Sequence, residues 1–337
     1  MSITLALKYR PRTFSDVVEQ DVQIQVLEYQ IKNNLHKNAY LFTGPAGTGK
    51  TTCARIFADA INCGKGNPIE VDAARNNGVD DVRNIIDNSN FKSMESKYKV
   101  YILDEVHMFS AGAWNAMLKL LEEPPESTII LMCTTDPQKI PATILSRVQR
   151  YDFKKITFES VVNRLHHIIK EENLLGNPVN VEEEAVNYIA KIADGGMRDA
   201  ITLLDKCLGL EKNLRVEDVI KVLGISGYDN MFDLLEAIIA QDAKKAAKIV
   251  EELHNNGVDM RAFIRQFYLF TIDLNKFNLF HNFKYIKIPE LYKDRMTDLT
   301  DELCQSLMEE FTNFYHQTKW ETGVKELLVG KVMLICQ

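Results

Sequence analysis

The strongest chemical pattern in this sequence is the run GPAGTGKT at residues 44–51, which Thr52 follows. Glycines at this spacing let successive backbone N–H groups turn inward around a phosphate, while a lysine neutralises phosphate oxygens and a threonine hydroxyl can ligate Mg²⁺. A strand-like run precedes the motif and a helical run to Ile61 follows it, which is the context such a loop requires. We therefore expect a nucleotide-binding loop rather than a simple glycine-rich turn, formed by Gly44, Pro45, Ala46, Gly47, Thr48, Gly49, Lys50, Thr51 and Thr52.

A pair of carboxylates is the second chemical feature. The apolar run Lys99–Leu103 ends in Asp104 and Glu105, and ligands of open parallel sheets bind at the carboxyl ends of the strands. We expect Asp104, with Thr51, to hold Mg²⁺, Asp104 doing so through water, and Glu105 to polarise an attacking water. Taken alone, the pair fits a solvated acidic turn equally well, and the nearby phosphate loop favours the catalytic interpretation.

Three more side chains suit positions near a γ-phosphate. Thr135 follows the strand candidate Ile129–Cys133 and is favoured over Thr134 for orienting the water, although these two residues alone favour a strand-end turn. Arg147 follows a helical segment and could act as an arginine finger on a neighbouring subunit's nucleotide, a role worth about 10³–10⁵ in rate, or simply interact with the helix dipole. Arg198 opens a helix and could reach the γ-phosphate in cis or form an i,i+4 surface pair.

A parallel sheet is needed to bring these residues together. Between Tyr40 and Phe153, short strands alternate with helical patterns, which is typical of a parallel sheet covered on both faces. The expected strands are Tyr40–Thr43, Pro68–Asp72, Val100–Asp104, Ile129–Thr134 and Arg150–Phe153.

The rest of the chain has helical periodicity. Short amphipathic helices are expected from Phe158 to about Leu223, with breaks at residues 176–178 and 195–196, and longer helices from Tyr228 onward. The predicted fold class is therefore α/β plus all-α. Its expected domains are an α/β nucleotide-binding domain at 1–157, a small helical domain at 158–224 and a helical bundle at 225–337.

Composition limits the remaining function classes. The 337 residues carry a net charge of -7, so a nucleic-acid partner must be bound through a local patch. The six cysteines have no metal-ligand spacing, which predicts a reducing compartment and no zinc. No apolar run approaches the length of a signal core or a membrane span, so we expect a cytoplasmic protein without a membrane partner.

Together with Tyr9, Arg10 and Pro11, these motifs make the chain resemble the bacterial sliding-clamp loader ATPases, in particular the gamma/tau subunits of DNA polymerase III. The resemblance is close from Lys8 to about Asp205, and the other runs that carry it are 14–20, 44–51, 104–108, 120–125, 134–139, 144–147 and 196–199. It implies an AAA+ parallel-sheet ATPase domain, a helical lid domain and a helical collar that mediates oligomerisation. ATP binding would drive opening of a ring clamp and grip of primer-template DNA, and hydrolysis would release both.

The same resemblance implies individual roles and partners. Arg10, Pro11, Val17 and Val18 would line the adenine, with Thr135 as first sensor, Arg198 as second sensor and Arg147 as the finger supplied in trans. The expected partners are the sliding clamp, primer-template DNA, copies of this chain and one or more different loader subunits in a pentamer-like spiral. The expected cofactors are ATP and Mg²⁺.

Two departures from the family pattern stand out. A four-cysteine zinc module usually lies between the first helix and the second strand, whereas here Cys63 runs directly through residues 64–67 into the strand candidate. The chain also ends where the collar should end, so we expect the extension of tau-type subunits to be absent. Such a compact loader would suit a phage or another reduced replication system.

Two surface segments are candidates for macromolecular contacts. The loop after the second strand offers Arg75, Asn76 and Asn77 for sequence-independent phosphate binding, although Asn77 with Gly78 also reads as a turn. Ile86, Phe91 and Met94 are candidate apolar anchors for the clamp, with packing on the sheet the favoured alternative for Ile86.

Two other functions compete with the motor ATPase. A noncatalytic scaffold subunit of a clamp loader would not need the intact phosphate-binding and acidic motifs. Another AAA+ DNA-remodelling motor, such as a branch-migration helicase or a replication initiator, often ends in a winged-helix domain, and the final third here has no β-wing pattern.

Overall fold

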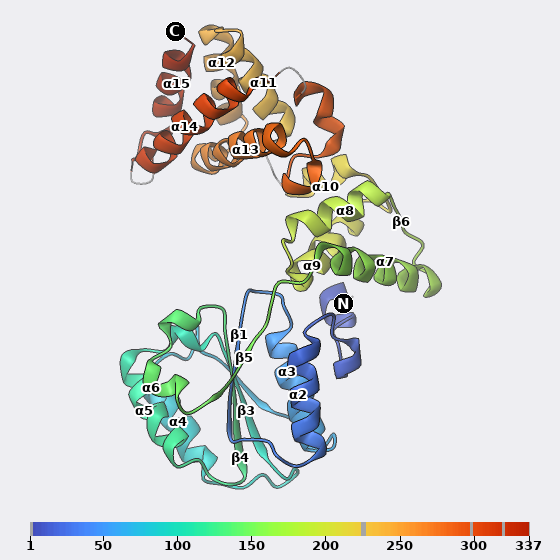
Figure 1. Ribbon diagram of the computed structural model, residues 1–337, viewed down its shortest axis with the longest axis vertical. Helices are drawn as coiled ribbons and strands as arrows, with labels where there is room; N and C mark the ends of the chain where they lie inside the picture. Colours follow the sequence, from blue (N-terminus) through green and yellow to red (C-terminus); the bar gives the residue numbers. More distant parts are fainter. Residues whose placement is uncertain (1–2, 224–226, 297–298, 319–320, 337) are drawn as a thin grey trace. The chain divides into compact units, whose positions relative to one another are not determined.

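The computed structural model describes residues 3–223, 227–296, 299–318 and 321–336 (Figure 1). The chain forms two compact units. The first contains Met1–Pro178 and Ile189–Asp205, and the second contains Val179–Tyr188 and Lys206–Gln337. The three-domain division proposed from the sequence stays a prediction.

A 5-stranded sheet forms the centre of the first unit. Its strands are ordered β2-β3-β4-β1-β5, and every neighbouring pair is parallel. The bounds are β1 Ala39–Thr43, β2 Ile69–Asp72, β3 Lys99–Asp104, β4 Thr128–Thr134 and β5 Gln149–Asp152. The predicted α/β fold class is confirmed, and all strand carboxyl ends meet at one edge.

Alternating side chains of the strands face two separate cores. Tyr40 and Phe42 of β1 belong to one buried cluster, whereas Ala39 and Leu41 belong to the other. Helices on both faces cover these clusters, which is why the central strands β1, β3 and β4 are mostly apolar rather than alternating. Figure 1 shows α2 (Asp21–Lys32) and α3 (Lys50–Ile61) on one face, and on the other α4 (Val79–Ser89), α5 (Ala111–Glu122) and α6 (Ala142–Leu145).

Short segments complete the edge of the sheet where the strands end. They are α1 (Leu5–Lys8), η1 (Phe14–Asp16), η2 (Val106–Met108) and η3 (Pro137–Lys139). Beyond the sheet the chain is mainly helical, with α7 (Phe158–Leu174), α8 (Glu183–Ile192), α9 (Met197–Leu208) and α10 (Val216–Leu223). The breaks around residues 176–178 and 195–196 fall where they were predicted, whereas the break between α9 and α10 was not predicted. A two-stranded parallel pair, β6 (Asn180–Val181) with β7 (Asn213–Leu214), was not predicted.

The second unit is a helical assembly with an aromatic core. Phe232 packs against Phe270 and Tyr292, and Phe267 packs against Phe311. Its later elements are α11 (Tyr228–Ile239), α12 (Ala243–Asn255), α13 (Met260–Phe280), η4 (Phe283–Tyr285), η5 (Glu290–Met296), α14 (Asp301–Thr318) and α15 (Val324–Ile335). Within the described ranges, no helix has the length and apolar character needed to cross a membrane.

A candidate nucleotide site at the carboxyl edge of the sheet

The loop between β1 and α3 has the backbone form that its glycines require. Gly47 has φ +71°, and a Cβ there would lie 3.0 Å from the Cα of Gly196. Gly44 has φ +141°, and its Cβ would lie 2.3 Å from the carbonyl oxygen of Phe153. The first amides of α3 have no acceptor within the helix and carry the positive end of its dipole. This loop can therefore cradle an anion with main-chain groups.

Lys50 supplies the positive charge within the loop. It is only 6% exposed, and its Nζ donates to the carbonyl oxygens of Gly44 at 2.9 Å and Pro45 at 2.7 Å. Burial lowers the pKa of Lys50, while the nearby carboxylates of Glu105 and Asp104 oppose that shift. Phosphate oxygens could replace the two carbonyl partners, so this ammonium group fits a triphosphate.

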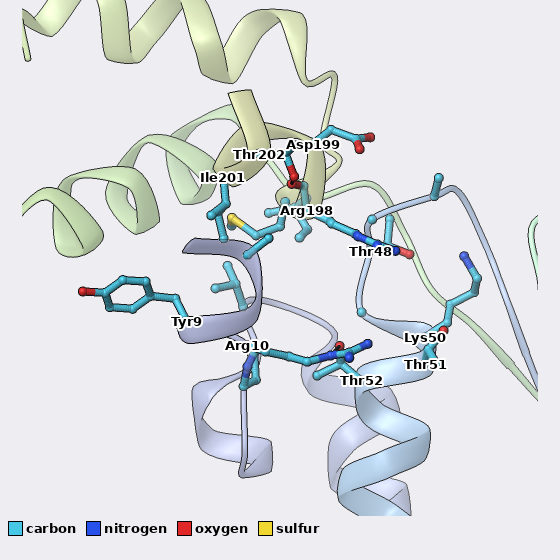
Figure 2. A pocket seen from close by; sticks show the side chains of 18 of the residues that line it. Tyr9, Arg10, Thr48, Lys50, Thr51, Thr52, Arg198, Asp199, Ile201 and Thr202 are labelled. Carbon is cyan, nitrogen blue, oxygen red and sulfur yellow. Dashed lines mark hydrogen bonds between the residues drawn. The ribbon is translucent and has the colours of Figure 1, made fainter. Parts of the chain in front are cut away.

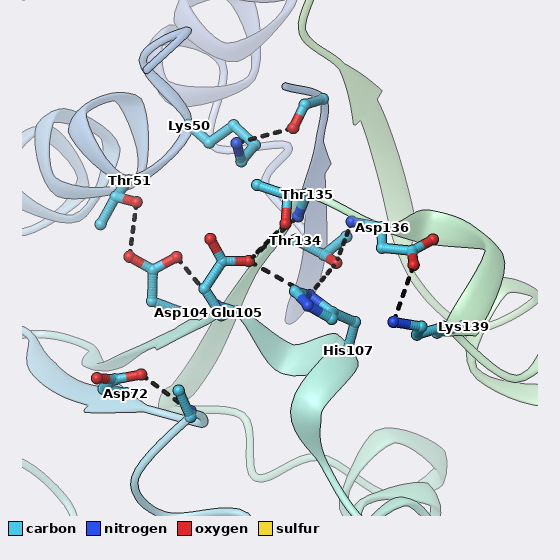
Figure 3. A network of polar contacts seen from close by, with 12 residues as sticks. Lys50, Thr51, Asp72, Asp104, Glu105, His107, Thr134, Thr135, Asp136 and Lys139 are labelled. Atoms are coloured by element: carbon cyan, nitrogen blue, oxygen red, sulfur yellow. Dashed lines mark hydrogen bonds and ion pairs between the residues drawn. The ribbon is translucent and has the colours of Figure 1, made fainter. Parts of the chain in front are cut away.

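Thr51 and Asp104 form the pair expected to hold a metal ion. The Thr51 hydroxyl donates to Asp104 Oδ2 at 2.8 Å, and the backbone N–H of Glu105 donates to Asp104 Oδ1 at 3.0 Å (Figure 3). A hydroxyl and a carboxylate beside a phosphate loop are the oxygen donors that Mg²⁺ prefers. The residues present therefore fit a magnesium nucleotide.

Glu105 lies at the centre of a polar network. Its Oε2 accepts from the hydroxyl of Thr135 at 3.0 Å and from the Thr135 N–H at 3.3 Å, and it lies 3.3 Å from His107 Nδ1. Thr134 is fully buried, and its hydroxyl instead contacts His107 and accepts from the N–H of Asp136. Thr135, the favoured threonine, is thus the one beside the candidate catalytic carboxylate. Sequence reasoning did not identify His107.

These residues open onto a cavity of about 540 Å³ (Figure 2). Of the predicted nucleotide-binding residues, those that line it are Arg10, Pro11, Val17, Val18, Ala46, Gly47, Thr48, Gly49, Lys50, Thr51, Thr52, Asp104, Glu105 and Arg198. Gly44 and Pro45 contribute the carbonyls that hold Lys50, and Thr135 does not line the cavity but contacts Glu105, which does. Every residue that lines the cavity belongs to the first unit.

Two of the predicted arginines, Arg10 and Arg198, reach this cavity from opposite sides. The Nε of Arg10 donates to the Thr52 hydroxyl at 3.3 Å, and burial lowers the pKa of Arg10, with the nearby charge of Arg55 adding to the shift. Arg198, in the first turn of α9, extends toward the phosphate loop in Figure 2. The N–H of Met197 donates to the Gly47 carbonyl at 3.0 Å, so the start of α9 touches the loop directly.

A second group of residues lines the cavity without having been assigned to the site from the sequence, although Tyr9 and Asp199 lie in its motif runs. The N-terminal residues before Arg10 and several residues of α7 and α9 complete its wall; they include Thr4, Ala6, Leu7, Tyr9, Arg164, Asp199, Ile201, Thr202 and Asp205. No spacing rule connects these short stretches, because three separate segments meet only in the folded chain.

Arg147 lies apart from this chain's own cavity. It follows α6, where it donates to the Thr143 carbonyl at 2.7 Å and pairs with Glu122 of α5 at 2.8 Å. The pair is on the surface, so a partner could compete for the guanidinium at small cost. This position is compatible with a role in trans, which stays a prediction.

The candidate DNA and clamp residues occupy two exposed segments. Arg75, Asn76 and Asn77 follow β2, where Asn76 donates to the Asp72 carbonyl and Arg75 lies 3.6 Å from the Asp72 carboxylate. Phe91 and Met94 are exposed beyond the end of α4, whereas Ile86 packs in part against the sheet. Their roles in binding remain predictions, and partial burial makes Ile86 the least suited anchor.

The cysteines are free thiols. Cys63 is exposed in the short connection from α3 to β2, and the other five are buried. Among the described residues, no group of three or more His, Cys, Asp or Glu side chains is arranged to hold a metal ion.

Three family models match successive parts of the chain. The model described as DNA polymerase III, delta subunit, matches residues 19–77 and 69–157. The clamp loader subunit ATPase lid domain of DNA polymerase III matches 160–210, and domain III of subunits gamma and tau matches 214–318. Together these matches extend from the phosphate loop into both helical regions.

Curated relatives agree with these models. The chain is 36% identical to Bacillus subtilis DNA polymerase III subunit tau over 98% of the chain and 62% of that protein. It is 34% identical to subunit gamma of Buchnera aphidicola subsp. Schizaphis graminum over 76% of the chain and 75% of the relative. For Escherichia coli subunit tau, 34% identity covers 77% of the chain and 43% of the relative. The chain thus spans less than two thirds of both tau subunits.

Solved structures share the architecture at lower identity. The Thermotoga maritima RuvB Holliday junction branch migration motor matches with a TM-score of 0.52 and 19% identity, over 74% of this chain and 86% of that one. At this identity the likeness shows a shared fold alone.

Proposed function

Because the chain belongs to the family of DNA polymerase III gamma and tau subunits, we propose that it is an ATPase subunit of a DNA sliding-clamp loader. ATP binding would drive opening of a ring clamp and grip of primer-template DNA, and hydrolysis would release the clamp on DNA for processive replication. The observation that carries this proposal is the convergence of Lys50, the Thr51–Asp104 pair and the Glu105–Thr135 pair beside one cavity.

Each of these groups has a defined task. The amides of the loop and Lys50 bind and orient the triphosphate, and Arg10 with Pro11, Val17 and Val18 forms the side that receives the base. Mg²⁺, when held by Thr51 and by Asp104 through water, would neutralise charge on the phosphate oxygens. Glu105 accepts a proton from, or polarises, the attacking water, and the Thr135 hydroxyl fixes the direction of that carboxylate. Arg198 adds positive charge from α9.

Assembly would complete the site. Arg147 is the finger that we propose this chain offers to a neighbouring subunit's nucleotide, within a pentamer-like spiral of copies of itself and different loader subunits. Sequence-independent contacts from Arg75, Asn76 and Asn77 suit DNA phosphates, and Phe91 and Met94 suit a clamp pocket. We further propose a cytoplasmic location, in the host cytoplasm if the chain is phage-encoded, and no zinc requirement.

Steady-state ATP hydrolysis tests the proposal. The chain, with its co-purified partners, is assayed with and without primer-template DNA and the cognate clamp, alongside Lys50→Ala. DNA and clamp together should stimulate turnover, and Lys50→Ala should abolish it because the buried ammonium group is lost. Lys32→Ala, an exposed lysine of α2, is the control for removal of one positive charge.

Two outcomes would contradict this function. Absence of turnover in the full assembly would favour a noncatalytic scaffold subunit. ATP hydrolysis that the clamp does not stimulate, but that drives DNA remodelling, would favour another AAA+ motor.

A further inference from the structure

The N-terminal segment forms one wall of the nucleotide cavity but has little structure of its own. Thr4, Ala6, Leu7, Tyr9, Arg10 and Pro11 all line the cavity. The only helix in this stretch is α1, of 4 residues, and a single helical turn is not stable in isolation. Contacts from elsewhere must therefore hold this wall in place.

Most of the polar contacts that hold the segment come from α7 and α9. Arg164 of α7 donates to the Tyr9 carbonyl at 3.0 Å, and Asp205 of α9 accepts from the Leu5 N–H at 3.1 Å. Toward the sheet, Arg10 contacts Thr52 of α3 at 3.3 Å. The wall is thus attached to the helices that follow the sheet as well as to the phosphate-loop helix.

Glu172 makes the densest of these attachments. This residue in the last turn of α7 is 6% exposed, and its Oε1 accepts from Lys8 Nζ and from the Tyr9 hydroxyl, each at 2.6 Å. Its Oε2 accepts from Asn177 Nδ2 at 3.0 Å. Burial alone would raise the pKa of Glu172, but the hydrogen bonds from Lys8, Tyr9 and Asn177 lower it overall. The carboxylate is therefore charged and paired at neutral pH.

Burial of a carboxylate is costly unless its oxygens are paired, and here two of the three partners are the residues directly before Arg10. We propose that Glu172 is a positioning residue for nucleotide binding, which holds Lys8 and Tyr9 and so places Arg10 and Pro11 against the base side of the cavity. This inference rests on the proposed ATPase function. Glu172 itself is not among the residues that line the cavity, so it acts through the segment that it holds.

A positioning role predicts that loss of Glu172 changes nucleotide affinity but not the rate of the chemical step. Loss of the Glu172 charge frees the wall that receives the base but leaves Lys50, Asp104 and Glu105 in place. Nucleotide affinity should fall while the rate at saturation persists. A residue that only stabilised the fold would lower the amount of active protein and leave the affinity of the remainder unchanged.

The first experiment measures ATP affinity and saturated turnover for Glu172→Gln, which preserves side-chain size. We expect ATP to bind roughly tenfold more weakly, with kcat unchanged within about twofold. Glu171→Gln, the same charge change one position earlier on α7, should leave ATP affinity as in the wild type. Tyr9→Phe provides a milder variant, and its effect should be smaller in the Glu172→Gln background because the two side chains share one hydrogen bond.

A second measurement does not depend on nucleotide. Amide hydrogen exchange of residues 4–12 without ATP should be faster in Glu172→Gln than in wild type or Glu171→Gln. If residues 4–12 of Glu172→Gln exchange faster but its ATP affinity is unchanged, the positioning role is wrong. If their exchange is unchanged, Glu172 does not hold the N-terminal segment in place. If the wild type binds no ATP, the proposed function itself fails. If the wild type and Glu172→Gln both bind ATP with equal affinity, only this inference is refuted.

Discussion

Thr134 and Thr135 show how neighbouring side chains of one type can have different surroundings. Thr135 donates its hydroxyl to Glu105, at the cavity, whereas the adjacent Thr134 is fully buried and serves the local backbone and His107. The two threonines differ in the face of the chain that they occupy at the end of β4. One threonine thus lies beside the candidate catalytic carboxylate and the other in the protein interior.

Thr135→Val should lower kcat on the order of 10²-fold with little change in ATP affinity, because Glu105 loses the donor that directs it. Thr134→Val is the matched control. It should lower the free energy of unfolding by about 1–2 kcal/mol, because the partly buried N–H of Asp136 loses its acceptor. Turnover assays and urea titrations of both variants test this assignment, and equal kinetic effects would refute it.

At the scale of elements, the sequence identified the central strands β1, β3 and β4 well because each of them faces two apolar cores. β3 alternates Val100 and Ile102 with Tyr101 and Leu103 between opposite clusters, so its whole run is apolar and easy to recognise. β6 and β7 were missed because strands of 2 residues carry no periodicity. Glu172 was missed because a glutamate in a helical last turn is typical of a solvated surface, and its partners lie more than 160 residues earlier.

The phosphate loop was predictable because its backbone conformation can be adopted only with glycine at certain positions. Gly44→Ala should lower the free energy of unfolding of the first unit by roughly 3 kcal/mol or more, since the new Cβ would meet the Phe153 carbonyl. Gly176 also has a positive φ, of +83°, but has open space around it. Gly176→Ala should therefore lower the free energy of unfolding by only about 1 kcal/mol. Denaturation curves followed by circular dichroism would show the difference, and equal losses would contradict the packing argument.

At the scale of the whole molecule, we propose that the chain carries both halves of a shared active site. It offers a complete nucleotide cavity, and on a separate surface it offers Arg147, which only Glu122 and local groups hold in the isolated chain. Such an arrangement suits an assembly in which each subunit completes the site of the next. The net charge of -7 places any DNA contact on a local surface rather than on a general positive field.

The most direct measurement of the central claim is clamp loading itself. Labelled cognate clamp and primed circular DNA are incubated with the chain and its co-purified partners, and the clamp that stays on DNA is separated from free clamp. We predict retention that requires ATP, is lost with Lys50→Ala, and is strongly reduced with Arg147→Ala. Retention of clamp independent of ATP and of Lys50, or ATP-driven movement of DNA strands without any clamp retained, would contradict the account.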